Sequence, residues 1–249
     1  MRRIRLDISY DGTGFCGWQI QAAGRTVQGV LEEALSGLLK ETVRVTGSGR
    51  TDSGVHAENQ TCHFDTENSS IPAEKLAPAL NSFLPADVRV RQSRAVADTF
   101  HARFSANGRV YRYRFYRGVP VPPIWRNCCW GIRQPIELER LNRLASLFVG
   151  THDFTAFCAA GDRNRSKVRT VYRAFFFEQP PFLVFEIAGN AFLWNMVRSV
   201  VGTILSEYNH EDAEETVSEL LQTGDRSGCG TTAPARGLSL VKVIYESEK

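Results

Sequence analysis

The alternation of apolar and polar residues predicts a chain of short strands and amphipathic helices. Residues 3–9 place Ile4, Leu6 and Ile8 on one side of an extended segment, the pattern of a half-buried strand. After Thr26, apolar side chains recur at helical spacing, and Thr26 itself is suited to cap the first turn. Further strands are expected over residues 43–46, 57–64 and 88–96, and further helices over 27–39 and 72–84. The order is β-α-β-β-α-β.

The second half repeats this order. Strands are predicted over residues 109–117, 169–178, 182–189 and 238–245, and helices over 137–148, 191–208 and 213–222. Two copies of one supersecondary unit favour an α/β (α+β) fold with two ferredoxin-like, RRM-like halves, residues 1–104 and 105–249. We expect these halves to be related by a pseudo-twofold axis and to form a continuous, mainly antiparallel sheet with a central cleft. The halves share negligible sequence identity, so the expectation depends on element order.

Composition excludes several classes of protein. The 249 residues are 43% hydrophobic and 23% charged, which is ordinary for a globular protein. No apolar run approaches the roughly 18–20 residues that span a bilayer. The first residues alternate in charge and apolarity, unlike a signal peptide. The simplest expectation is a soluble, cytoplasmic protein.

The cysteines do not indicate a metal or disulfide framework. There are six, without a C-x-x-C pair. His56, Cys62 and His63 are close in sequence, but a second pair of ligands at recognisable spacing is missing. We therefore expect free thiols and no metal.

Basic residues are concentrated although the net charge is only +3. Residues 99–136 contain no Asp or Glu but seven arginines, and a second cluster occupies residues 163–173. In residues 110–117 arginines alternate with aromatic side chains, which suits contact with phosphates and bases. The same alternation would arise from a strand with aromatics in a core and arginines in solvent. Both interpretations stay open.

The most unusual segment is the loop Gly47-Ser-Gly-Arg-Thr-Asp-Ser-Gly-Val-His-Ala57. Its glycines permit close backbone approach, and it lacks the Gly-Lys-Ser/Thr of a phosphate-binding Walker loop. Between two strands it would present Arg50 and Asp52 at the end of a sheet. The alternative is a tight turn in which Asp52 only accepts backbone hydrogen bonds.

This loop resembles the G-R-T-D-x-G-V-H-A signature of the TruA family of tRNA pseudouridine synthases. Further similarities follow in order along nearly the whole chain: Tyr10-Asp-Gly-Thr-Gly-Phe-Cys-Gly-Trp-Gln19 with Arg25-Thr-Val-Gln28, Phe100-His-Ala-Arg-Phe-Ser-Ala106 with Tyr111-Arg-Tyr113, Asn190-Ala-Phe-Leu-Trp-Asn-Met-Val-Arg198 with Val201-Gly202, and Ala233-Pro-Ala-Arg-Gly-Leu238. Residues 119–134 and 209–230 match weakly. The resemblance implies an isomerase that converts uridine to pseudouridine in tRNA, at positions 38, 39 and 40 of the anticodon stem-loop.

The same resemblance assigns roles to residues. Asp52 is the expected catalytic nucleophile, although a carboxylate can also act as a base on the ribose. No cofactor is expected, because the reaction neither oxidises nor adds anything. Arg198 interrupts an apolar helical segment, and the resemblance makes it the partner of Asp52; the alternative is an exposed arginine with a short surface pair. Tyr111 is expected to contact the uracil, or else to fill a core.

The resemblance also implies contacts with the target nucleotide, contacts with the RNA backbone and an oligomeric state. Leu238 resembles the apolar residue that packs on the base; the alternative is the first core residue of the last strand. Arg50 resembles the side chain that helps to extrude the nucleotide or fills the space it leaves, and the alternative is a contact with phosphate. The expected RNA-backbone contacts are Arg109, Arg112, Arg114, Arg165 and Lys167. The resemblance also implies a homodimer. Its rivals are a non-catalytic RNA-binding protein, a related synthase acting on another RNA or position, and, more distantly, a metalloenzyme.

Overall fold

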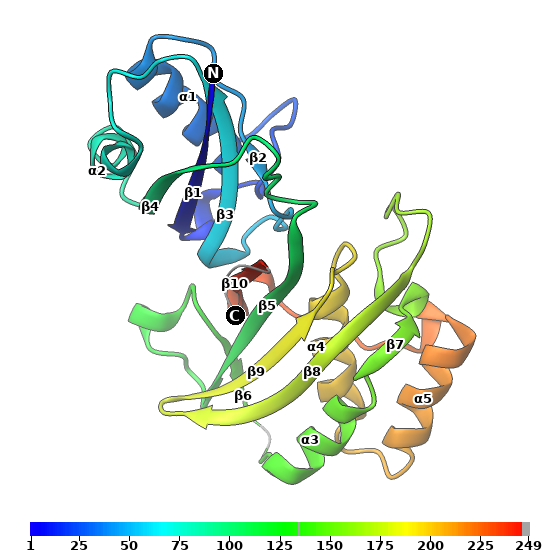
Figure 1. Cartoon of the computed structure of the whole chain (residues 1–249). Coiled ribbons are helices and arrows are strands. Elements are labelled where there is room, and N and C mark those ends of the chain that lie inside the picture. The colour runs from blue at the N-terminus through cyan, green and yellow to red at the C-terminus, as the bar shows by residue number, and fades with distance from the viewer. Residues whose placement is uncertain (134, 246–249) are drawn as a thin grey trace. The chain divides into compact units, whose positions relative to one another are not determined.

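The computed structural model describes residues 1–133 and 135–245 (Figure 1). Its residues group into two compact units: one holds Met1–Asn107 and the C-terminal segment from Ser239, and the other holds Gly108–Leu238. The last strand thus lies with the first unit, although the sequence division at residues 104 and 105 leaves it in the second half. Its strand pairing joins residues far apart in the chain, which periodicity does not report.

The first unit is a four-strand sheet with two helices. Its order is β4-β1-β3-β10, and β2 pairs with β3. The elements are β1 (Arg2–Tyr10), α1 (Val27–Leu39), β2 (Thr46–Gly47), β3 (His56–Thr66), α2 (Leu76–Asn81), β4 (Val88–Val96) and β10 (Leu238–Tyr245). β1 is antiparallel to β3 and β4, whereas β10 runs parallel to β3. Both helices lie on one side of this sheet (Figure 1).

Alternation along β1 explains this packing. Ile4, Leu6 and Ile8 are fully buried, as the sequence predicts. The intervening Arg5 and Asp7 are buried on the opposite side, and Arg5 Nε donates to Asp7 Oδ1 at 2.9 Å. A charged pair on a buried face satisfies the rule that a buried charge needs a partner.

The second unit contains a set of mainly antiparallel strands and the helices α3, α4 and α5. Its order is β5-β9-β8-β7, with β6 parallel to β5. The elements are β5 (Ala106–Arg117), β6 (Trp130–Ile132), α3 (Leu138–Ser146), β7 (Gly150–Asp153), β8 (Val168–Gln179), β9 (Phe182–Gly189), α4 (Met196–Glu207) and α5 (Ala213–Thr223). The expected α/β class with a mainly antiparallel sheet is confirmed.

An aromatic core holds the second unit together. Tyr113, Phe115, Phe176 and Phe185 are essentially inaccessible to solvent. The rings of Tyr113 and Phe115 have centroids 4.8 Å apart, and those of Phe176 and Phe185 are 4.7 Å apart. Aromatic contacts of this kind add to the free energy gained from burial. The interpretation that the alternating aromatic side chains of β5 fill a core is thus confirmed for Tyr113 and Phe115.

Several element boundaries differ from the predictions. The predicted helix over 72–84 is a short 3₁₀ turn followed by α2, and Pro78 falls in the first turn of α2, where a missing N–H costs little. Of the predicted strand over 43–46, only Thr46 lies in a strand, the two-residue β2 (Thr46–Gly47). Helix α4 begins at Met196, because Asn195 has a left-handed backbone (φ 64°) that cannot continue a helix. The strands β6 and β7 were not predicted.

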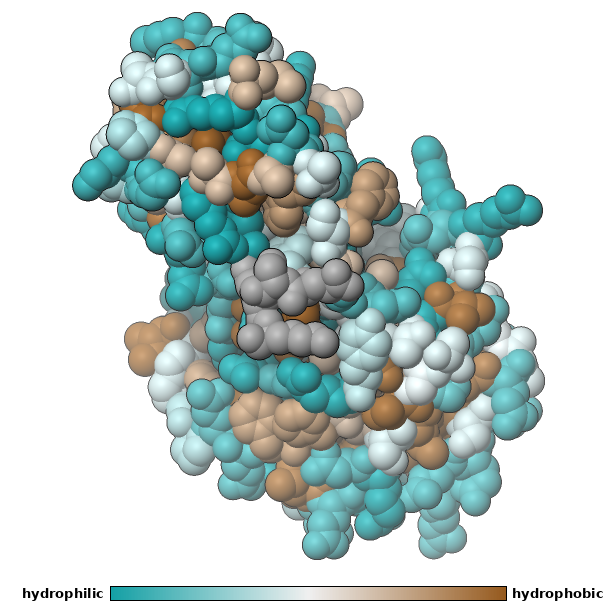
Figure 2. All heavy atoms as spheres, viewed as in Figure 1, coloured by the Kyte–Doolittle hydropathy of each residue, from teal (hydrophilic) through white to brown (hydrophobic). Residues whose placement is uncertain are grey.

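Polar residues dominate the surface visible in Figure 2, with apolar side chains scattered between them. This is the usual surface of a globular protein. None of the helices in residues 1–133 and 135–245 combines the length and the apolar character that crossing a bilayer requires.

Candidate active site

The loop carrying Asp52 connects β2 to β3 and is pinned at its start by three hydrogen bonds. Ser48 N donates to Thr61 O at 2.8 Å, and Ser48 Oγ donates to Gln60 Oε1 at 2.5 Å. Gln60 Nε2 in turn donates to Gly49 O at 3.0 Å. The side chain of Gln60 is fully buried, so these bonds are shielded from water. The loop therefore leaves the sheet in one defined direction.

The middle of the loop is held by the segment that follows β1. Trp18 N donates to Thr51 O at 3.1 Å, and Gly54 N donates to Phe15 O at 3.3 Å. The Thr51 hydroxyl lies 2.8 Å from Tyr10 Oη. Both neighbours of the Asp52–Ser53 pair are thus tied to the body of the first unit.

Gly17 makes this close approach feasible. It has a φ of +97°, and an added Cβ would lie 2.6 Å from Thr51 O. A side chain there would meet both steric clash and backbone strain. The requirement for glycine shows that the two backbone segments are in direct contact.

Asp52 itself is half-buried, and its carbonyl oxygen accepts from Val55 N at 3.1 Å, which closes a tight turn. Arg50 is exposed, and its Nε donates to Gln19 Oε1 at 3.2 Å. The structure therefore brings Arg50 and Asp52 together on one ordered loop, as the sequence predicts. The hydrogen bond from Val55 N to Asp52 O explains the turn, but it involves the backbone of Asp52 and does not assign a role to its carboxylate.

Tyr111 belongs to the second unit. It lies on β5, is largely buried, and meets the ring of Phe192 edge to face with centroids 5.2 Å apart. Two residues on, Tyr113 is fully buried, its Oη donates to Pro234 O at 2.7 Å, and burial raises the pKa of its phenol. Tyr113 is thus a structural residue. Leu238 is also buried.

Arg198 lies in the first turn of α4 and is half-buried. Its Nε donates to Ala233 O at 2.7 Å, and its Nη1 donates to Asn195 Oδ1 at 3.0 Å. Ala233 N donates back to Arg198 O at 3.1 Å. These bonds fix the side chain to the segment that precedes Leu238, so Arg198 is not a freely rotating surface arginine.

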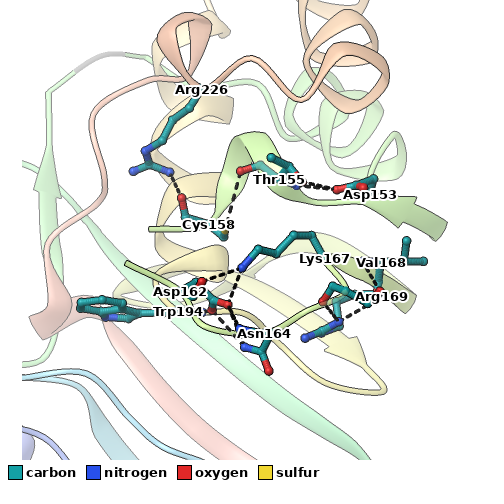
Figure 3. Close-up of polar contacts among 11 residues, drawn as sticks. Asp153, Thr155, Cys158, Asp162, Asn164, Lys167, Val168, Arg169, Trp194 and Arg226 are labelled. Atoms are coloured by element: carbon teal, nitrogen blue, oxygen red, sulfur yellow. Dashed lines mark hydrogen bonds and ion pairs between the residues drawn. The ribbon is translucent and has the colours of Figure 1, made fainter. Parts of the chain in front are cut away.

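The turn before α4 is anchored by Asp162, as Figure 3 shows. Asp162 Oδ2 accepts from Trp194 N at 2.9 Å, and Trp194 O accepts from Ala159 N at 2.9 Å. Lys167 Nζ donates to Asp162 Oδ1 at 2.7 Å. Burial opposes ionisation of Asp162, but the hydrogen bonds from Lys167, Trp194 and Asn164 outweigh it and hold its pKa well below the ordinary value.

Two arginines of the second sheet share one carboxylate. Glu186 is only 5% exposed, and it accepts from Arg112 Nε at 2.8 Å and from Arg173 Nε at 2.9 Å. The guanidinium of Arg112 also lies 5.6 Å from the ring centroid of Phe177. Arg112 therefore has structural partners, and its expected contact with RNA stays a prediction.

The other expected RNA contacts differ in their surroundings. Arg109 is buried and donates to Asn190 O at 2.8 Å. The ammonium of Lys167 faces Asp162. Arg114 is half-buried, and Arg165 is exposed. Arg165 is thus the most exposed of these side chains, and all five expected RNA contacts stay predictions.

Sequence reasoning missed two functional candidates. Asp162 was overlooked among the arginines that surround it, although a lone acid within a basic cluster is a signal of an internal ion pair. The buried Glu32 of α1 was also missed, and only its place on the apolar face of that helix could have indicated it. Within the described part of the chain, no group of three or more His, Cys, Asp or Glu side chains is arranged to hold a metal ion.

Comparison with known proteins identifies the family of the chain. The model of a family described as tRNA pseudouridine synthase matches residues 8–105 and 144–246. The chain therefore belongs to the tRNA pseudouridine synthase family, whose members are isomerases, and the predicted resemblance is confirmed.

Individual relatives narrow the comparison. The chain is 44% identical over 245 residues to a tRNA pseudouridine synthase A from Thermoanaerobacter sp. (strain X514), covering 98% of this chain and 100% of the relative. It is 43% identical to the protein of the same name from Treponema denticola, covering 99% and 94%. For the protein of that name from Halalkalibacterium halodurans the identity is 44%, covering 96% and 90%.

Proposed function

We propose that this chain isomerises uridine to pseudouridine in tRNA, at positions 38, 39 and 40 of the anticodon stem-loop, with Asp52 as nucleophile. The observation that carries the proposal is the loop around Asp52. Its backbone is tied down on both sides, and its sequence matches the family signature. A group held in one geometry by its surroundings is pre-organised for catalysis.

The chemistry needs only groups that a protein carries. The Asp52 carboxylate attacks ribose C1′, the C1′–N1 bond breaks, and its electron pair stays with the uracil. After the ring turns, C5 attacks C1′ and the ester bond to Asp52 breaks, which returns the carboxylate. The C5 proton leaves and N1 gains a proton, so atoms and charge balance.

We assign supporting roles to residues of both units. Arg198 pairs with the Asp52 carboxylate and orients it, because a guanidinium forms strong, directional hydrogen bonds to a carboxylate. Tyr111 and Leu238 contact the uracil, and Arg50 acts on the extruded nucleotide. The exposed Arg165 contributes most to the expected attraction to the RNA backbone, with Arg109, Arg112, Arg114 and Lys167 as further contacts. A homodimeric assembly and a cytoplasmic location complete the proposal.

Release of the C5 hydrogen tests the reaction. Purified protein is incubated with tRNA that carries tritium at C5 of uridine, without added cofactor and with a chelator present. We expect tritium to enter water with the wild-type chain and not with Asp52→Asn. Asp98→Asn is the matched control, because Asp98 is an exposed acid of the same unit and the charge change is identical.

Pseudouridine mapping tests the sites. Cells lacking the enzyme are supplied with the wild-type or the Asp52→Asn gene, and their tRNA is sequenced for pseudouridine. Near-normal tritium release by Asp52→Asn would exclude the nucleophile assignment. Modification only outside the anticodon stem-loop would exclude the proposed positions.

A further inference from the structure

A chain of side-chain amides links Arg50 to a buried carboxylate of the first unit. Arg50 Nε lies 3.2 Å from Gln19 Oε1, Gln19 Nε2 lies 2.9 Å from Gln28 Oε1, and Gln28 Nε2 lies 2.9 Å from Glu32 Oε1. Glu32 is only 6% exposed. A site loop is thus connected through two glutamines to the core face of α1.

The buried end sets the direction of the first amide. Gln28 Nε2 faces Glu32 Oε1 and, at 3.1 Å, Val45 O. A backbone carbonyl can only accept, so the atom facing it must be the amide nitrogen. Glu32 is held in turn by Val45 N, which donates to Oε1 at 2.9 Å, and by Arg44 Nη1 at 2.8 Å from Oε2.

This direction passes to the next amide. Gln28 Oε1 accepts from Ile20 N at 3.1 Å, and a backbone N–H can only donate. The group of Gln19 that meets Gln28 Oε1 must therefore be its nitrogen. The oxygen of Gln19 is left to face Arg50 Nε, which also can only donate. Each contact pairs a donor with an acceptor, and reversing either amide would bring like groups together.

The contact has a consequence for Arg50. An exposed arginine loses rotamer entropy when it is ordered on a ligand. A fixed acceptor at Nε removes part of that loss in advance and aims the plane of the guanidinium. Because Nε is the atom engaged, the contact does not use the terminal nitrogens.

We propose that Gln19, oriented through Gln28 by Glu32, is a positioning residue that sets the direction of the Arg50 guanidinium toward the target nucleotide. This inference rests on the proposed function, because it assigns Arg50 a part in the reaction. Gln19 acts through Arg50, so its removal slows the conversion of bound tRNA and leaves the affinity for tRNA nearly unchanged.

The test is a double-mutant cycle on single-turnover tritium release. Gln19→Met removes both hydrogen bonds at similar side-chain volume, and it is measured in the wild-type and in the Arg50→Ala background. We expect about a five- to tenfold slower reaction in the wild-type background, the scale of one ordinary, solvent-exposed hydrogen bond. In the Arg50→Ala background the further loss should be under about twofold.

Two variants control the cycle. Gln28→Met removes the hydrogen bond that orients Gln19 but no contact of Arg50. It should therefore slow the reaction by about two- to fivefold, an effect smaller than that of losing one whole hydrogen bond. Gln21→Met is the matched control, because Gln21 is an exposed glutamine of the same segment whose Nε2 donates to Cys16 O at 2.7 Å. It should leave the rate unchanged. Thermal midpoints and tRNA affinities of all variants confirm that folding and binding persist.

The outcomes are distinct. Equal loss from Gln19→Met in both backgrounds, or no loss in either, overturns the inference while the enzyme remains active. Full activity of Arg50→Ala overturns the role of Arg50 on which the inference depends. Failure of the wild-type chain to release tritium would instead remove the proposed function itself.

Discussion

Asp162→Asn separates the anchoring of the α4 turn from the chemistry of the site. Asparagine keeps the shape of the side chain but loses the charge that faces Lys167 Nζ at 2.7 Å. Its amide nitrogen must also replace one of two oxygens that accept from donors, Lys167 on one side and Trp194 N on the other (Figure 3). One of these donors therefore loses its side-chain acceptor, and Lys167 Nζ would keep only the backbone oxygen of residue 162, at 2.9 Å.

The structure bounds the magnitude. The side chain of Asp162 is 2% exposed and that of Lys167 is 20% exposed, so solvent screens the pair only weakly. Breaking one partner of a buried pair costs about 3–5 kcal/mol, and the partial exposure of Lys167 places the loss near the lower end, about 3 kcal/mol. At about 2–4 °C per kcal/mol, the midpoint of thermal unfolding should fall by about 6–12 °C.

The pH dependence has a definite sign. The pKa of Asp162 is lower in the folded chain than in the unfolded chain. A carboxyl of this kind stabilises the folded state at pH values above its unfolded pKa, about 3.9, and loses that contribution as the pH falls through the folded value. The gap between wild type and Asp162→Asn should therefore be complete at pH 7 and narrow only below about pH 4.

Thermal unfolding and hydrogen exchange measure the effect. Exchange of the α4 amides reports the second unit by itself, which a single midpoint for two units does not. Asp153→Asn is the matched control: Asp153 also accepts from a backbone N–H two residues on, Thr155 N at 2.9 Å, but it is exposed. It should change stability by less than about 0.5 kcal/mol. Equal shifts for the two variants would refute the buried-anchor argument.

The remaining predictions concern RNA binding, turnover and the site loop. Arg114→Ala should weaken tRNA binding and flatten its dependence on salt. Arg112→Ala should also lower the free energy of unfolding by about 1–2 kcal/mol, because it leaves Glu186 with one partner fewer. An unchanged salt slope would show that the RNA binds elsewhere. Arg198→Ala should reduce turnover more than tRNA affinity, and a defect in affinity alone would contradict its role. Gly12→Ala should abolish activity by displacing the Asp52 loop, since its Cβ would lie 2.1 Å from a carbonyl oxygen there; wild-type activity would show that the loop tolerates the shift.

Local rules predicted much of the fold. The Thr26 cap is present, with its side chain accepting from Gly29 N, and the helix runs over Val27–Leu39 as expected. The β8–β9 hairpin also follows its pattern, because alternation and a Pro-Pro turn are properties of adjacent residues. The start of α4 could not be predicted in this way. Asn195 adopts a left-handed conformation, and apolar spacing on both sides of it still resembles a helix.

The residues of the site loop could be predicted from the sequence, but the hydrogen bonds that hold the loop could not. A loop of unusual composition identified Arg50 and Asp52, since glycines and charged residues between two strands are visible in the sequence. The bonds that hold this loop were not, because Gln60 lies on the next strand and Gln19 on the segment before α1. Hydrogen bonds between residues that are 11 or 31 positions apart depend on the fold, and no periodicity encodes them.

The positive charge of β5 is smaller in the folded chain than its own sequence suggests. Residues 99–136 contain no Asp or Glu, but Glu186 lies on the neighbouring strand β9 and is 2.8 Å from Arg112 Nε. Together with Arg173, this group carries one net positive charge on three side chains. Counterion release depends on the phosphates that a protein neutralises. Arg112 should therefore contribute less to the salt slope than the exposed Arg165.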